Sequence, residues 1–332
     1  MVQSEFFDAE TLRANGSLQH DLHERAASVA REQFGERVFV RAVVEISNFC
    51  RENCQYCGMR RDNDALERYR ARYEELAELL IQHRPSIVTD VNIQAGEDPV
   101  AVREVAIPLI RALREETNLG ISVCLGTLNR RQYRELREAG ATIYILKFET
   151  GSEELYRQLE APGNFPERIA HIQALAAEDW KVSSGFICGL PGEGDAELRK
   201  NFEWAARLPL AGCSVSPFIP GEETPVAGAP AAGINLTLNC MAALRILRPE
   251  LVIPAVSALN LADGNGYRRG LRTGANLVTI NMTPAPIRGE YLLYKRERFI
   301  MTEERIREAI AAENLVPSTE SLADYYAARA QV

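Results

Sequence analysis

The chain has 332 residues, of which 46% are hydrophobic and 25% are charged, and it carries a net charge of −8. This composition predicts a folded globular protein, and the acidic balance argues against nucleic acid or an anionic membrane as the main partner. No run of residues is long and apolar enough to span a bilayer, and the polar start from Met1 to Glu10 does not resemble a signal peptide. We therefore expect a cytoplasmic protein with a small-molecule or protein partner.

The first 37 residues are expected to form a helical extension on the bottom or flank of the main domain, because Asp8 to Phe34 has an intermittent apolar stripe. A strand then leads into a loop that contains three cysteines. After this loop, strand-like and helix-like segments alternate. The expected strands cover residues 86–94, 120–125, 142–149, 181–188, 213–219, 252–259 and 276–282. The expected helices cover residues 73–83, 100–115, 130–139, 165–177, 196–208, 237–247 and 266–273.

Together with the strand before the cysteines, this pattern gives about eight βα units. Eight units predict an α/β fold, a complete (β/α)8 TIM-type barrel over residues 38–300. An open, doubly wound sheet is the alternative, and the absence of a Gly-x-Gly-x-x-Gly turn favours the barrel. Residues 301–332 are expected to form a helical tail, with a helix from Thr302 to Glu313 and a peripheral cap from Ser321 onward.

Three cysteines lie in one polar loop, with the spacing Cys50-x-x-x-Cys54-x-x-Cys57. Three thiolates this close can hold a [4Fe–4S] cluster and leave one of its four irons free to bind a small molecule. A structural zinc site is a poorer explanation, because no fourth ligand lies nearby. Buried structural thiols normally sit among apolar residues, whereas these alternate with Arg51, Glu52 and other polar side chains.

The cysteine motif, with Tyr56 just before its third cysteine, resembles the signature of the radical S-adenosylmethionine (SAM) enzymes. The wider run from Glu45 to Asn63 resembles the branch that contains biotin synthase, methylornithine synthase and the [FeFe]-hydrogenase maturase HydE, and HydE most closely. The resemblance implies that SAM chelates the open iron and is cleaved reductively to a 5′-deoxyadenosyl radical. It extends from about Val38 to Tyr294.

The same resemblance implies a SAM site at the carboxyl ends of the strands. Glu97 would accept hydrogen bonds from the SAM amino group, and Gly96 would let the backbone approach the ligand. Glu149 would lie near the ribose or methionyl part, and Arg168 would contact the SAM carboxylate. Ile187 would pack on adenine. The predicted SAM-binding residues are therefore Tyr56, Gly96, Glu97, Glu149, Arg168 and Ile187.

The remaining four cysteines bear on the type of chemistry. Cys124 is the candidate catalytic cysteine, since its position is expected to face the barrel interior, whereas Cys188, Cys213 and Cys240 are expected to be core thiols. Serines at 122 and 183 stand where biotin synthase would carry cysteines for a second cluster, and Asn260 lies where its serine-rich arginine strand is expected. These differences argue against sulfur insertion by that route.

We therefore predict a radical SAM enzyme of the HydE type that acts on a small substrate, with flavodoxin or ferredoxin as electron donor and no nucleic-acid or membrane partner. A methylornithine-synthase-like mutase and a sulfur-inserting enzyme remain open, as does a non-catalytic iron–sulfur scaffold. The Gly/Pro/Ala-rich segment from Gly221 to Gly233 is either a substrate-side loop or a surface insertion.

Overall fold

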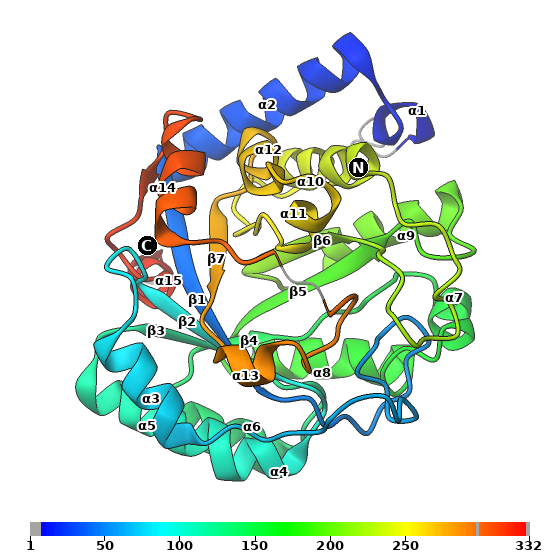
Figure 1. The fold of residues 1–332 in the computed structure, drawn as a ribbon. Coiled ribbons are helices and arrows are strands. Elements are labelled where there is room, and N and C mark those ends of the chain that lie inside the picture. The colour runs from blue at the N-terminus through cyan, green and yellow to red at the C-terminus, as the bar shows by residue number, and fades with distance from the viewer. Residues whose placement is uncertain (1–7, 297–298, 330–332) are drawn as a thin grey trace.

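The computed structural model describes residues 8–296 and 299–329. Its centre is a curled sheet of seven parallel strands in the order β6-β5-β4-β3-β2-β1-β7, and a short strand, β8, pairs with the start of β1 (Figure 1). The strands are β1 (Arg37–Ser47), β2 (Asp90–Ala95), β3 (Gly120–Cys124), β4 (Ile143–Ile145), β5 (Lys181–Cys188), β6 (Gly212–Pro217), β7 (Leu277–Asn281) and β8 (Val316–Pro317).

Helices follow most strands and surround the sheet. The longer ones are α2 (Gly16–Phe34), α3 (Tyr73–Gln82), α5 (Ile107–Glu116), α6 (Arg130–Ala139), α8 (Phe165–Ala177), α9 (Asp195–Arg207), α10 (Ile234–Leu247), α14 (Glu303–Ala311) and α15 (Leu322–Arg329). The shorter ones are α1 (Ala9–Leu12), α4 (Pro99–Ala101), the π-helical turn η2 (Val102–Ala106), α7 (Glu153–Gln158), α11 (Ala258–Ala262), α12 (Gly266–Arg272) and α13 (Ala285–Arg288). The alternation of strand and helix predicted from the sequence is confirmed.

The strand predicted at residues 252–259 is wrong. This segment makes only isolated bridges, between Val252 and Gly212 of β6 and between Pro254 and Leu277 of β7. Pro254 has no N–H to donate, so a regular ladder cannot continue through it. The chain then turns, with Leu259 N–H donating to the carbonyl of Val256, and enters α11. Between β6 and β7 the described sheet therefore has only a bridging segment, where the sequence predicted a full strand.

Two other predicted strands are shorter in the structure. The run expected over 86–94 begins only at Asp90, after a turn in which Val88 N–H bonds the carbonyl of Pro85. The run expected over 142–149 is regular only from Ile143 to Ile145, and beyond it Glu149 makes an isolated bridge to Phe186. β-branched residues favour extended backbone, but ladder partners decide where a strand is regular.

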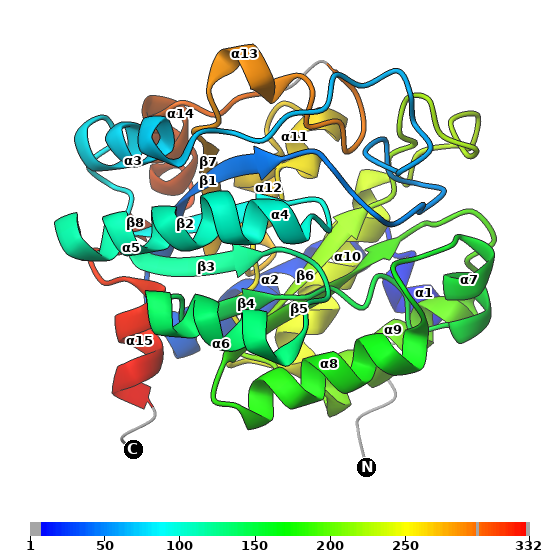
Figure 2. The same ribbon diagram turned by 90° about the horizontal axis from the view of Figure 1, so that it is seen from below.

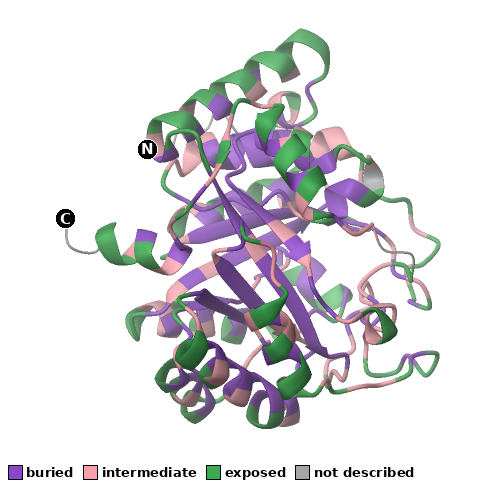
Figure 3. Ribbon diagram, turned by 60° about the vertical axis from the view of Figure 1, so that its left-hand side comes forward, coloured by how far each residue is buried: buried purple, intermediate pink, exposed green. Residues whose placement is uncertain are grey.

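The side chains of β1 show which face of the sheet packs against the helices and which face points into the space enclosed by the curled sheet. Val38, Val40, Ala42, Val44 and Ile46 belong to the main hydrophobic core beneath the surrounding helices. Residues between them point to the other face, because side chains alternate along a strand. Figure 3 shows buried strands enclosed by helices whose outer faces are exposed. The curled sheet therefore encloses an interior lined by the alternate set of residues.

The C-terminal helix α15 lies at the amino ends of the strands (Figure 2). Leu322 and Tyr325 are buried in a cluster with Phe34 and with the strand residues Phe39 and Leu277. The predicted C-terminal segment therefore forms a helix that covers the amino ends of the strands and buries Leu322 and Tyr325 there; the last three residues of that prediction lie outside the described part of the chain. At the other end of the chain, α2 packs along α10 on the flank, through Leu22, Ala26 and Ala242 among others (Figure 1). None of the described helices is both long and apolar enough to cross a bilayer.

The carboxylate of Asp90 accepts the Leu322 N–H at 3.0 Å and so caps the first turn of α15. Burial raises the pKa of Asp90 to about 6, although its hydrogen bonds from Leu322 and Thr89 oppose the shift. Because the folded pKa lies above the unfolded value, this group's contribution to stability is complete below about pH 4 and is lost as pH rises through 6. From pH 5 to pH 7.5 the loss is about 1 kcal/mol.

We predict that Asp90→Asn removes this part of the pH dependence, because the amide does not ionise. The free energy of unfolding of the variant, relative to the native protein, should rise by about 1 kcal/mol between pH 5 and pH 7.5. Denaturant unfolding at the two pH values measures it. A difference that stays constant across this range would show that Asp90 does not titrate there.

Candidate functional site

The cysteine loop lies at the carboxyl ends of the strands, where the arrowheads point in Figure 2. It leaves β1 at Ser47 and immediately contacts the end of β2. Gly96 N–H donates to the carbonyl of Ser47 at 3.1 Å, and Glu97 N–H donates to Cys50 Sγ at 3.3 Å. A Cβ atom added at Gly96 would lie 2.3 Å from the carbonyl oxygen of Phe49. The end of β2 can therefore touch the loop only because residue 96 is glycine.

The three thiols of the loop influence one another electrostatically. Burial raises the pKa of all three, to about 12 for Cys57, and Cys50 raises the pKa of Cys57 further. Such thiols stay protonated alone and lose their protons when iron binds. No three His, Cys, Asp or Glu side chains of the described residues converge to hold a single metal ion. The thiols of a cubane cluster bind different irons, so this donor set fits a [4Fe–4S] cluster with one open iron.

Arg68 organises the cysteine loop from within. Its guanidinium donates to the carbonyl oxygens of Asn48 at 2.6 Å, Met59 at 3.0 Å, Arg60 at 2.7 Å and Asn63 at 3.1 Å. A buried carbonyl without a donor is costly, so one arginine that satisfies four of them fixes the path of the loop. No sequence pattern points to this role, since Arg68 is one of several arginines between Arg60 and Arg72.

Glu97 and Arg168, both predicted to hold SAM, lie together. Arg168 Nη1 is 3.1 Å from Glu97 Oε1, and the two side chains are 4% and 7% exposed. Arg168 also donates to Thr127 Oγ1 at 2.6 Å and to the carbonyl of Lys147 at 3.0 Å. Burial disfavours the guanidinium charge, but Tyr156 and Glu97 outweigh it, so the pKa of Arg168 is raised. Arg168 and Glu97 therefore form a buried ion pair beside the cysteine loop, which we call the charged floor of the site.

Arg51, a residue between the first two cysteines, completes this network. It donates to Glu97 Oε2 from Nε at 3.2 Å and from Nη2 at 3.1 Å, while the Thr127 N–H bonds Oε1 at 3.0 Å. A carboxylate has about four lone-pair positions, and Arg51, Thr127 and Arg168 use all of them. Arg168 Nη2 makes no hydrogen bond to a described residue. The site therefore offers a free arginine donor, whereas Glu97 is saturated by the protein.

Glu149, Ile187 and Tyr56 form a second group of predicted SAM-binding residues. Glu149 has a left-handed backbone with φ of 61°, and its carbonyl accepts the Ile187 N–H at 2.8 Å. Ile187 belongs to an apolar cluster with Leu155 and Phe218, against which Tyr56 packs. The Tyr56 hydroxyl is buried and has no hydrogen-bond partner among the described residues. The structure thus brings together an apolar wall, a carboxylate and an unsatisfied hydroxyl.

Cys124 ends β3 beside Gln94 of β2. Burial raises the pKa of the Cys124 thiol, and the nearby Lys147 opposes this shift. Lys147 is itself held as a cation, because Glu149 outweighs the effect of burial and raises its pKa. The other three cysteines are buried in the core, as predicted, with Cys188 Sγ 3.3 Å from Thr237 Oγ1 of α10. Cys124 differs from them in being only partly buried.

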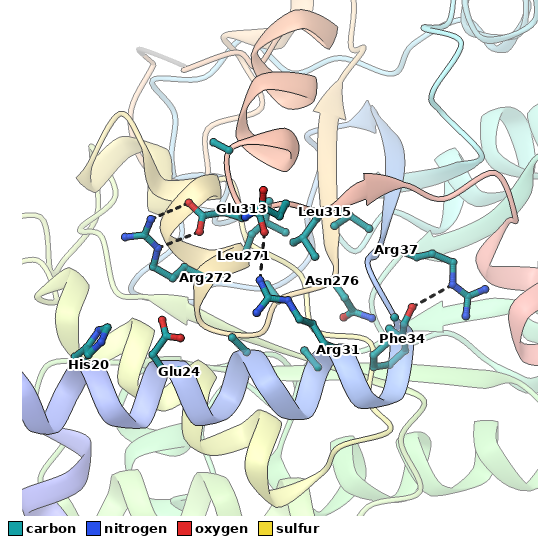
Figure 4. Close-up of a pocket in the computed structure, with 17 residues that line it drawn as sticks. His20, Glu24, Arg31, Phe34, Arg37, Leu271, Arg272, Asn276, Glu313 and Leu315 are labelled. Carbon is teal, nitrogen blue, oxygen red and sulfur yellow. Dashed lines mark hydrogen bonds and ion pairs between the residues drawn. The ribbon is translucent and has the colours of Figure 1, made fainter.

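A pocket of about 340 Å³ lies far from these groups, between α2, α12 and the loop after α14 (Figure 4). Its walls include Arg37 and Asn276, which adjoin the amino ends of β1 and β7. Glu313 at its rim is paired with Arg272 at 3.0 Å. Because the cysteine loop follows the carboxyl end of β1, this pocket is not part of the same site.

The sequence of the chain was compared with protein-family models and with known proteins. Residues 44–205 match the model of the radical SAM superfamily. The chain is 34% identical over 276 residues to the [FeFe] hydrogenase maturase subunit HydE of Thermotoga maritima, which covers 82% of this chain and 78% of that protein. The chain belongs to the radical SAM superfamily.

Other relatives lie in the branch predicted from the sequence. The 3-methylornithine synthase of Methanosarcina barkeri is 28% identical over 273 residues, covering 79% of this chain and 75% of that protein. The crystal structure of methylornithine synthase (PylB) superposes with a TM-score of 0.81 at 24% identity, covering 96% of this chain and 94% of that one. The protein is thus a radical SAM enzyme whose cofactors are a [4Fe–4S] cluster and SAM, and the fold is that of this family.

We predict that Gly96→Ala prevents assembly of the cluster site, because the added Cβ would overlap the Phe49 carbonyl and lie 2.9 Å from Cys50 Cβ. Iron and sulfide bound per chain after anaerobic reconstitution should fall well below those of the native protein. Gly228→Ala is the matched control, since a Cβ there meets nothing within 4 Å. Full iron binding by Gly96→Ala would contradict the proposed contact.

Proposed function

We propose that Cys50, Cys54 and Cys57 hold the [4Fe–4S] cluster and that the enzyme cleaves SAM reductively there. Bound at the open iron, SAM supplies a 5′-deoxyadenosyl radical when the cluster provides one electron. The observation that carries the proposal is the convergence of three thiols, the Arg168–Glu97 pair and the Tyr56–Ile187 wall at one end of the sheet. A small acidic electron carrier such as flavodoxin or ferredoxin is the proposed reductant.

The charged floor and the apolar wall support a specific orientation of SAM. The free Nη2 of Arg168 suits the methionyl carboxylate, because a guanidinium binds carboxylates through directed donors. Ile187 and its apolar neighbours suit adenine, and Tyr56 and Glu149 have polar atoms available for the ribose or amino group. Glu97 can accept the SAM ammonium only if Arg51 moves away, so we assign it first to the placement of Arg168.

The enclosed interior supports a small substrate that carries an acidic group. Arg41 of β1 has a buried Nε without a hydrogen-bond partner among the described residues, and its Nη2 donates to Thr279 Oγ1 at 3.5 Å. Lys147 adds a second cation near Cys124. The Asp90 carboxylate favours the Arg41 charge, but a buried guanidinium N–H without an acceptor is unfavourable, so the interior is adapted to an anion that accepts from it. Cys124 is the side chain we assign to contact that substrate.

Among the reactions of this branch we favour HydE-like maturation of a metallocofactor, on the 34% identity to HydE. A methylornithine-synthase-like mutase is the second candidate, supported by the 28% identity to that enzyme. Sulfur insertion is less well supported, because Ser122 is occupied as a donor to the Val91 carbonyl at 3.1 Å and Ser183 replaces the other expected cysteine.

We also propose that the segment around Val252 and Pro254 closes the sheet into a complete eightfold barrel, since it bridges both β6 and β7. Closure shields a carbon radical from water and from unintended hydrogen donors. In this view residues 38–300 form the barrel, residues 1–37 an extension on its flank, and residues 301–332 a tail over its base.

The reaction is tested by anaerobic reconstitution followed by addition of dithionite and SAM. The native protein should release 5′-deoxyadenosine and methionine, whereas Cys54→Ala should release neither, because a cluster with two thiol ligands is not retained. Lys200→Ala, at an exposed position of α9, is the control. If the reconstituted native protein makes no 5′-deoxyadenosine with any reductant, the proposal is wrong.

The assignment of Arg41 is tested without knowledge of the substrate. Arg41→Met removes a buried cation while keeping most of the apolar stem, so the substrate-free protein should be stabilised by about 1 kcal/mol. Denaturant unfolding measures the change, and Arg37→Met, whose guanidinium is exposed and paired with Glu320, should not stabilise. A destabilised Arg41→Met protein would show that Arg41 is satisfied by the fold itself.

A further inference from the structure

Two loops that flank the proposed SAM site are joined by a buried hydrogen-bonded relay. Asn201 of α9 is fully buried. Its Oδ1 accepts the N–H of Gly151, and its Nδ2 donates to Glu193 Oε1 at 3.1 Å. The other oxygen of Glu193 accepts the N–H of Gly189. The relay therefore connects the loop after β4 to the loop after β5 through two side chains.

Each end of the relay adjoins a residue assigned to SAM. Gly151 lies two residues after Glu149, and Gly189 lies two residues after Ile187. Glu149 and Gly189 both have left-handed backbone, with φ of 61° and 77°. Non-glycine residues adopt this conformation at a cost and keep it only where surrounding contacts fix it. The relay supplies such contacts directly beside both residues.

The first loop also packs closely on α9. A Cβ at Gly151 would lie 2.5 Å from the carbonyl oxygen of Lys200 and 2.8 Å from the backbone nitrogen of Asn201. Glycine is therefore required for the Gly151 N–H to reach Asn201. The cost of burying the Glu193 carboxylate is seen in its pKa, which burial raises to about 7 despite the hydrogen bond from Gly189. An acid retained at that cost, with both oxygens bonded to the relay, indicates a specific requirement for its shape.

We propose that Asn201 and Glu193 are positioning residues for SAM, which fix the loops that follow Glu149 and Ile187 and so orient the side chains of these two residues toward the nucleoside. This inference rests on the assignment of Glu149 and Ile187 to SAM in the proposed function. Neither Asn201 nor Glu193 contacts the ligand. Their effect is on SAM affinity, and the cluster, which is held by other loops, is unaffected.

Exchanging the two side-chain chemistries tests the relay. Glu193→Gln places an amide NH₂ group opposite either the Asn201 Nδ2 donor or the Gly189 N–H, and no protonation can relieve this donor–donor contact, so the two loops should separate. The dissociation constant for SAM, measured on the reconstituted protein by equilibrium dialysis, should rise about tenfold, as expected for the loss of one charge-assisted buried hydrogen bond. The electron paramagnetic resonance signal of the reduced cluster without SAM should stay unchanged.

The double variant Glu193→Gln, Asn201→Asp restores the donor in the opposite direction. The new amide nitrogen can donate to the new carboxylate, while the new amide oxygen still accepts from Gly189. We expect SAM affinity to return to within about threefold of the native value. Lys200→Ala, at the adjacent exposed position, is the control and should bind SAM as the native protein does.

The outcomes separate this inference from the proposed function. If the native protein neither binds nor cleaves SAM, the proposed function fails. If the native protein does both and Glu193→Gln, folded by circular dichroism, binds SAM with native affinity, the relay has no positioning role and only this inference is overturned. Weak binding by both the single and the double variant would also overturn it, because restored hydrogen bonding should restore affinity.

Discussion

The site depends on the contact between Gly96 and the cysteine loop. Because residue 96 has no side chain, the end of β2 approaches the Phe49 carbonyl, and the Glu97 N–H reaches Cys50 Sγ at 3.3 Å. The same approach carries the Glu97 side chain to Arg51 and Arg168, so thiols and charged floor are placed by one backbone contact. An N–H that points at a thiolate also stabilises its negative charge, as a cluster ligand requires.

The polar groups around this contact are of two kinds. Glu97 is saturated by Arg51, Arg168 and Thr127, and such fully bonded buried networks fix geometry. Tyr56 and Arg41 instead have buried polar atoms without partners among the described residues, which costs stability in the free protein. Unsatisfied groups of this kind are expected where a ligand completes the bonding. The saturated groups therefore fix the geometry of the site, and the unsatisfied ones are the groups to which the proposed function assigns SAM and substrate.

The two ends of the sheet are built differently. At the amino ends, Leu322 and Tyr325 of α15 pack against the first residues of the strands, and Asp90 caps the helix. At the carboxyl ends, long loops carry the cysteines, Glu97 and Glu149, and they are fixed by single side chains such as Arg68 and Asn201. The packed base and the loop-built opposite end agree with the proposed binding of cluster and SAM on the cysteine side.

The sequence by itself determined the chemistry and the order of the elements. The spacing of Cys50, Cys54 and Cys57 predicted the cluster loop, because three thiols in a polar loop have few other uses, and the strand–helix alternation predicted the parallel sheet that the structure shows. Only the tertiary structure decided the rest. Pro254 interrupts the expected seventh ladder, and the saturation of Glu97 and the burial of Asn201 depend on residues far apart in the chain. The spacing of apolar residues shows which face of a helix or strand is buried. It does not show which residue, far away in the chain, will form a hydrogen bond with a given polar side chain.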